Sequence, residues 1–134
     1  MKILLDTHIL LWTLSNDVKL SAKARNIIEN EHNDIYYSLI SVWEVEIKHL
    51  LHPENMQLNG KELNKYCKES GFHQLMIRDN HIFALEALKR KEGSPIHKDP
   101  FDRIILCQAI EEKMKFLTHD KLLSYYQVPN ICMV

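Results

Sequence analysis

Short apolar or β-branched runs alternate along the chain with longer stretches whose apolar residues recur at helical spacing. The short runs predict strands at residues 2–5, 34–39, 73–77, 115–118 and 130–133. The longer stretches predict helices at residues 7–15, 21–31, 41–51, 61–70, 79–90 and 99–112, with a helical turn at 121–126. This alternation predicts an α/β fold, with a central, mostly parallel sheet of four to five strands flanked by helices on both faces.

The totals fit one domain over residues 1–134, with 46% apolar and 26% charged residues. With only three Gly and four Pro, the chain is not low-complexity. Its three scattered cysteines indicate buried thiols in a reducing compartment, and no segment resembles a signal peptide or a membrane span. We therefore expect a cytoplasmic protein without a membrane partner. The net charge of −1 is a mild argument against a dedicated nucleic-acid binder.

Five acidic residues have a plain explanation as helix starters. Asp99 fits an N-cap and Pro100 the first helical position, which leaves Asp102 in the first turn, where the helix dipole favours an anion. Ser41 and Glu44 match a capping box, with Ser41 as the cap. Caps that directly follow strands are expected at two more positions, Asp6 and Asp120.

The expected positions of these acids in the fold give them a second meaning. Asp6 and Asp120 follow strands, and helices in right-handed βαβ units run antiparallel to their strands, so all five acids belong at the carboxyl edge of the sheet. Carboxylates that converge repel one another, and several ionised together need a hard divalent cation such as Mg²⁺ or Mn²⁺. Such a site suits phosphodiester hydrolysis, and the chain has no Gly-rich loop for a nucleoside triphosphate.

Four stretches together resemble the PIN domain family, and more narrowly its VapC-type toxins. They are LLDTHILLW at the start, SVWE followed by IK, then HKDPFDR, and THD near the end. None is specific alone, but their order and spacing are, and they span the whole chain. The resemblance implies a three-layer α/β/α sandwich. One departure is His8, where many relatives carry Asn.

The resemblance also implies an activity and a set of partners. The activity is a Mg²⁺- or Mn²⁺-dependent endoribonuclease, a phosphodiester hydrolase, acting as the toxin of a toxin–antitoxin pair. The partners are an RNA substrate, a cognate antitoxin and a second copy in a homodimer. The implied catalytic and metal-binding acids are Asp6, Glu44, Asp102 and Asp120. Asp102 is preferred to Asp99 because it precedes an apolar run as the family's third acid does, although Asp99 could join through water.

Several neighbours of these acids are candidates for supporting roles. Thr7 and Thr118 could hydrogen-bond a carboxylate, and Arg103 and Lys48 could contact a phosphate. Each has an ordinary alternative: finishing a strand, capping a helix, or pairing with a neighbouring charge. His97 could tune the site or contact substrate. Two tryptophans are expected in the core, Trp12 and Trp43.

Two other functions remain open at this point. One is a nuclease of the same fold that processes RNA without an antitoxin. The other is a non-catalytic module that binds RNA or protein. The presence of all four implied acids argues against the second, because a decayed site would usually have lost one.

Overall fold

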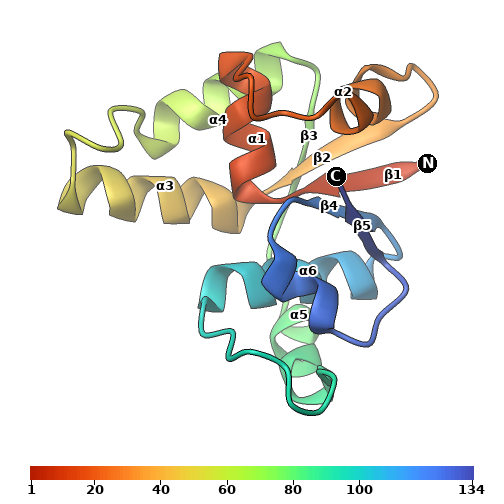
Figure 1. The fold of residues 1–134 in the computed structure, drawn as a ribbon. Coiled ribbons are helices and arrows are strands. Elements are labelled where there is room, and N and C mark those ends of the chain that lie inside the picture. Colours follow the sequence, from red (N-terminus) through yellow and green to blue (C-terminus); the bar gives the residue numbers. More distant parts are fainter.

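A five-stranded parallel sheet forms the middle of the molecule, and the computed structural model describes all of residues 1–134 (Figure 1). The strand order is β3-β2-β1-β4-β5, with every neighbouring pair parallel. The strands are β1 (Lys2–Leu5), β2 (Asp34–Ser38), β3 (His73–Leu75), β4 (Lys115–Thr118) and β5 (Ile131–Met133). The predicted parallel α/β sheet is therefore confirmed.

Helices cover both faces of this sheet. They are α1 (Thr7–Ser15), α2 (Ala22–Glu29), α3 (Leu39–Leu51), α4 (Gly60–Glu69), α5 (Asp79–Phe83) and α6 (Pro100–Glu111), with 3₁₀ helices η1 (Ala84–Ala87) and η2 (Lys121–Tyr125). Successive strand residues point to opposite faces, so Ile3 and Leu5 of β1 join one core with α1 to α4, while Leu4 joins another with α6 and η2. The result is three layers, α/β/α (Figure 1).

The helix predicted at residues 79–90 is shorter than its pattern suggested. It ends at Phe83, continues as a 3₁₀ helix to Ala87, and then turns extended. Residues 89–91 pair with residues 125–127 through backbone hydrogen bonds, and these bonds draw the chain away from a helical path. A contact between distant segments, which local spacing does not encode, sets this boundary.

The predicted capping box at Ser41 is wrong. The strand β2 runs directly into α3, and Ser38 is the N-cap, its side chain accepting a hydrogen bond from the Ile40 amide at 3.0 Å. Ser41 lies inside the helix, fully buried, with its Oγ 2.8 Å from Thr7 Oγ1. The helix therefore starts earlier than expected, which leaves Glu44 free for other partners than the Ser41 amide.

Two remaining expectations concern cysteines and membranes. All three cysteines are free thiols, with Cys67 and Cys107 buried, as their scattered positions predicted. None of the helices has the length and apolar character needed to cross a bilayer.

Candidate active site

Asp6 is the first acid of the site, and the end of β1 places it. Its amide donates to the Leu117 carbonyl at 2.9 Å, so the residue is fixed to the neighbouring strand β4. Although it precedes α1, its side chain caps nothing. Its Oδ2 accepts a hydrogen bond from Thr118 Oγ1 at 2.5 Å, while its Oδ1 is buried without a partner. The cap predicted at Asp6 is therefore absent, and one carboxylate oxygen stays available.

Glu44 is the most firmly held acid. It lies on α3, only 2% exposed, with Oε1 accepting from Thr7 Oγ1 at 2.8 Å and Oε2 paired with Lys48 Nζ at 2.6 Å. The Thr7 hydroxyl also contacts Ser41. Thr7 and Lys48, which the sequence marked as supporting residues, thus both contact Glu44 directly.

The start of α6 supplies Asp99 and Asp102. Asp99 is the N-cap, its Oδ1 accepting from the amides of Phe101 and Asp102 at 2.9 and 3.2 Å, with Pro100 at the first helical position. This confirms the cap predicted for Asp99. Asp102, in the first turn, is only 7% exposed. Its carboxylate accepts no hydrogen bond from the protein, unlike those of the other acids at this edge.

The interior face of α6 fixes where Asp102 points. Ile105, Leu106 and Ala109 pack into the core beneath the sheet. Gln108 accepts a hydrogen bond from the buried Ser38 hydroxyl at 2.5 Å, which connects α6 to the end of β2. This anchoring holds the first turn of α6 over the carboxyl ends of the strands.

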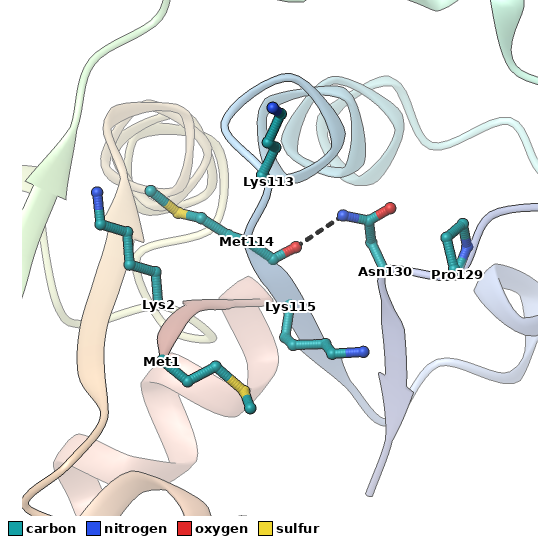
Figure 2. A pocket seen from close by; sticks show the side chains of 7 residues that line it. All are labelled: Met1, Lys2, Lys113, Met114, Lys115, Pro129 and Asn130. Carbon is teal, nitrogen blue, oxygen red and sulfur yellow. Dashed lines mark hydrogen bonds between the residues drawn. The ribbon is translucent and has the colours of Figure 1, made fainter.

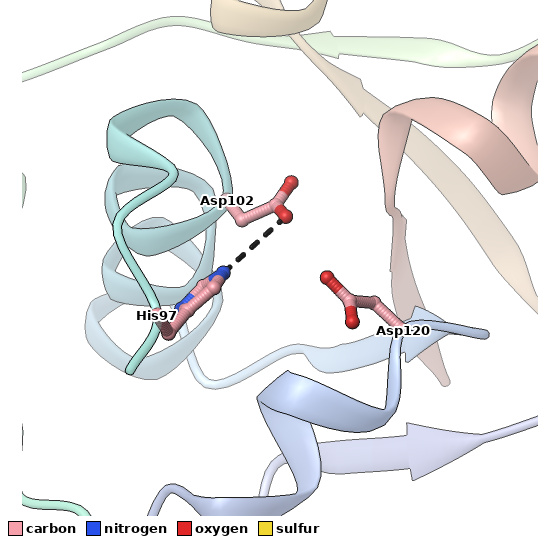
Figure 3. Close-up of side chains that lie close together, drawn as sticks. All are labelled: His97, Asp102 and Asp120. Carbon is pink, nitrogen blue, oxygen red and sulfur yellow. Dashed lines mark ion pairs between the residues drawn. The ribbon is translucent and has the colours of Figure 1, made fainter. Parts of the chain in front are cut away.

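Asp120 and His97 complete the group. Asp120 is the N-cap of η2, its Oδ1 accepting from the Leu122 amide at 2.9 Å, so the predicted cap is confirmed. His97 lies in the segment before α6, and its Nε2 is 3.5 Å from Asp102 Oδ2. Figure 3 shows His97, Asp102 and Asp120 facing one another, and their nearest potential ligand atoms all lie within 4.8 Å of each other.

A hollow of about 300 Å³ opens above these acids. Its lining residues are Asp6, His8, Trp12, Asp99, Asp102, His119 and Asp120. The Trp12 ring lies between two histidine rings, with centroids 6.1 Å from His8 and 5.5 Å from His119. Sequence reasoning missed both histidines as site residues, although each directly neighbours a motif acid or threonine.

A second hollow lies at the opposite, amino-terminal edge of the sheet (Figure 2). It measures about 200 Å³ and is lined by Met1, Lys2, Lys113, Met114, Lys115, Pro129 and Asn130. The Asn130 side chain donates to the Met114 carbonyl at 2.9 Å. This second hollow is lined by lysines and no carboxylate, so it offers no ligand set for a metal.

Burial and mutual repulsion make two of the acids, Asp6 and Asp102, unusually hard to ionise. Burial, followed by the charges of Asp6, Asp99, Glu44 and Asp120, raises the pKa of Asp102 to about 9. Burial also raises the pKa of Asp6 to about 6, although the Thr118 hydrogen bond opposes that shift. Burial lowers the pKa of His97, which favours the neutral imidazole. No positive charge offsets the raised pKa of Asp102.

The residues present fit a divalent cation. Asp6 Oδ1 is a buried acceptor without a donor. The Asp102 carboxylate lines the hollow and accepts no hydrogen bond from the protein, and Asp120 keeps one oxygen outside its cap. Carboxylate oxygens are the ligands that Mg²⁺ and Mn²⁺ prefer. The four predicted acids therefore lie at one edge, three of them lining the same hollow, with Glu44 bound to its neighbours beside it.

One sequence expectation turns out differently, and the phosphate contact of Arg103 stays a prediction. The positive charge of Arg103 lies near Tyr126 and His97. Trp43 is 57% exposed and packs against Phe101 with ring centroids 5.3 Å apart, so its predicted core position is wrong. Tyr126, which no motif indicated, contacts His97 Nδ1 with its hydroxyl at 2.8 Å.

A model of the PIN domain matches residues 3–128. No curated protein matches the chain in sequence. A crystal structure of VapBC2 from Rickettsia felis bound to a promoter DNA fragment is similar at a TM-score of 0.67 and 17% identity, covering 100% of this chain and 98% of that one.

Two further structures share the fold. A toxin–antitoxin complex from Klebsiella pneumoniae has a TM-score of 0.58 and 21% identity, covering 98% of this chain and 96% of that one. A domain of a functionally unknown protein from Methanocaldococcus jannaschii has a TM-score of 0.55 and 16% identity, covering 99% and 90%. At these identities the likeness shows a shared fold and nothing beyond it.

Proposed function

Since this chain belongs to the PIN domain family, we propose that its acidic edge is the centre of a divalent-metal-dependent endoribonuclease, the toxin of a toxin–antitoxin pair. The observation that carries the proposal is the buried Asp102 carboxylate. It has no donor of its own and faces the charges of Asp6, Glu44 and Asp120. Uncompensated buried charge of this kind is costly unless a cation binds it.

Asp6, Glu44, Asp102 and Asp120 would hold the cation, Mg²⁺ or Mn²⁺, with Asp99 as an alternative ligand through water. A divalent ion there supplies Lewis-acid chemistry: it acidifies water and neutralises charge on a phosphate. The protein does the positioning. Thr118 orients the Asp6 carboxylate through its Oδ2, which leaves the buried Oδ1 without a hydrogen-bond partner. Thr7 and Lys48 hold both oxygens of Glu44, so this acid keeps one orientation.

The aromatic side of the hollow supports a nucleic-acid substrate. His8, Trp12 and His119 stand beside the acids and present rings on which unpaired bases can stack. Single-stranded RNA offers such bases, whereas a duplex hides them. The net charge of −1 does not conflict with this, because stacking contributes affinity that does not depend on a basic surface.

The toxin role draws its support from the comparisons. Two of the structures that match nearly the whole chain are toxin–antitoxin assemblies, one of them bound to promoter DNA. We accordingly propose an antitoxin as partner, a homodimer as the assembled state and the cytoplasm as location. A nuclease that processes RNA without an antitoxin would use the same residues in the same way.

Cleavage of total cellular RNA tests the proposal. Wild-type protein, purified free of co-expressed partners, should cut RNA with Mn²⁺ or Mg²⁺ and stop when EDTA is added. Asp102→Asn should lower the rate at least about a hundredfold, the scale of losing one pre-organised electrostatic contact. The matched control is Asp79→Asn, since Asp79 is also an aspartate in the first turn of a helix, but exposed and outside the hollow.

The outcomes separate the candidates. Chelation-sensitive cleavage by the wild type and Asp79→Asn, but not by Asp102→Asn, supports the nuclease. Equal cleavage by all three proteins contradicts the site. Binding of RNA without cleavage under every metal condition favours a non-catalytic binding module.

A further inference from the structure

His97 has a buried ring nitrogen that makes no hydrogen bond within the protein. The residue is 7% exposed, and its Nε2 is fully buried without a hydrogen bond. That atom points between Asp102 and Asp120 (Figure 3). A buried polar atom without a partner is costly, so its persistence here needs an explanation.

The imidazole is held by the protein from its other side. Its Nδ1 lies 2.8 Å from the Tyr126 hydroxyl, and the two rings meet edge to face with centroids 5.6 Å apart. Tyr126 in turn is buried at the end of η2, the helix that Asp120 caps. One structural unit thus orients both His97 and Asp120.

A hydrogen bond to Asp102 does not account for this arrangement. Nε2 and Asp102 Oδ2 are 3.5 Å apart, whereas a charge-assisted N–H···O bond is about 2.7–2.9 Å long. The observed separation is too long for such a bond, so Nε2 remains without a hydrogen-bond partner beside the two carboxylates.

We infer that His97 Nε2 is a nitrogen ligand of the cation in the proposed nuclease centre, together with Asp102 and Asp120, and that it makes the site prefer Mn²⁺ to Mg²⁺. The inference rests on the proposed function. Imidazole suits transition-metal ions, while Mg²⁺ binds oxygen almost exclusively. One nitrogen ligand added to the carboxylates therefore discriminates between the two ions in a way that carboxylates alone do not.

Pulsed electron paramagnetic resonance of bound Mn²⁺ tests the inference, because a directly coordinated nitrogen gives a ¹⁴N coupling. Wild-type protein should show the coupling, and histidine labelled with ¹⁵N should shift it. His97→Gln should lose it. The double variant His8→Gln/His119→Gln, which removes the other histidines lining the hollow, should keep it. This double variant identifies His97 even where His97→Gln does not fold.

Metal affinity provides a second test of the inference. Calorimetric titration should show the ratio of Mn²⁺ to Mg²⁺ affinity falling about tenfold or more in His97→Gln, the scale of altered metal surroundings. Mn²⁺ binding and RNA cleavage without any ¹⁴N coupling would overturn the role of His97 and leave the nuclease standing. A coupling that survives in His97→Gln would also overturn it. Absence of Mn²⁺ binding altogether would defeat both proposals.

Discussion

The acids of the site fall into two halves that the protein treats differently. In the anchored half, formed by Asp6, Glu44 and their donors Thr7, Lys48 and Thr118, the protein satisfies every carboxylate oxygen except Asp6 Oδ1. In the open half, formed by His97, Asp102 and Asp120, the only carboxylate oxygen with a protein donor is the one that caps η2.

The two halves therefore differ in what stabilises them: protein donors hold the anchored half, whereas the open half needs a bound ligand. Hydroxyls and an ammonium group hold the anchored half, so its geometry exists without a cation. The open half brings unpaired acceptors and an unpaired nitrogen together, and its stability depends on what binds there. Three experiments test this contrast, from the largest expected effect to the smallest.

The largest effect concerns pH and the open half. Because the folded pKa of Asp102 is raised from 3.8 to about 9, the folded protein binds a proton there more tightly than the unfolded chain does. The resulting stability is complete below the unfolded pKa and is lost as pH rises through the folded one. Without metal, the free energy of unfolding should fall by several kcal/mol, at up to about 1.4 kcal/mol per pH unit, between about pH 4 and pH 9.

Chemical unfolding in EDTA across this range measures the fall. Asp102→Asn should reduce the fall in unfolding free energy with pH and should be more stable than the wild type at high pH. Asp79→Asn should show the same pH dependence as the wild type. Adding Mn²⁺ should reverse the trend, because the ion binds the deprotonated acids and stabilises the folded state that holds them. Identical pH profiles for wild type and Asp102→Asn would mean that Asp102 is not the strained carboxylate.

Glu44, in the anchored half, should respond to the loss of a donor. Thr7→Val keeps the shape of the side chain but removes the hydroxyl that contacts Glu44 and Ser41. Leaving a buried acceptor unsatisfied costs about 1–3 kcal/mol, so unfolding free energy should drop by that amount at pH values near neutrality.

The control for this substitution is Thr13→Val in the same helix. The Thr13 hydroxyl donates only to the Ile9 carbonyl of the preceding turn, at 2.7 Å and partly exposed. Denaturant midpoints should show a clearly smaller loss for Thr13→Val than for Thr7→Val. Equal losses would mean that Glu44 does not depend on its threonine donor, and the anchored half would lose its distinction.

The sequence predicts where the acids of both halves lie better than it predicts which donors they meet. Short apolar runs ending in polar residues predicted β1 and β4, and hence the positions of Asp6 and Asp120. The boundary errors have a different origin. Residues 89–91 leave the helix because they pair with residues 125–127, and Ser41 is buried because Thr7 reaches it from another element.

The same reasoning explains why the sequence does not predict the contact between His97 and Tyr126. His97 and Tyr126 are 29 residues apart, and their contact depends on how η2 packs beside the segment before α6. No local period or cap encodes that packing. A motif suggests which acids converge, whereas the fold decides which of them lack partners.

The smallest effect separates the two aspartates at the start of α6. Asn caps a helix about as well as Asp, so Asp99→Asn should change unfolding free energy by no more than a few tenths of a kcal/mol, whereas Asp99→Ala should cost about 1 kcal/mol. If Asp99 only caps, RNA cleavage by Asp99→Asn should stay within about threefold of wild type, since no metal ligand is lost. Thermal unfolding and cleavage assays on both variants measure this. Asp99→Asn could instead lose as much cleavage activity as Asp102→Asn with stability unchanged. That result would mean that Asp99 takes part in the open half and does not only cap the helix.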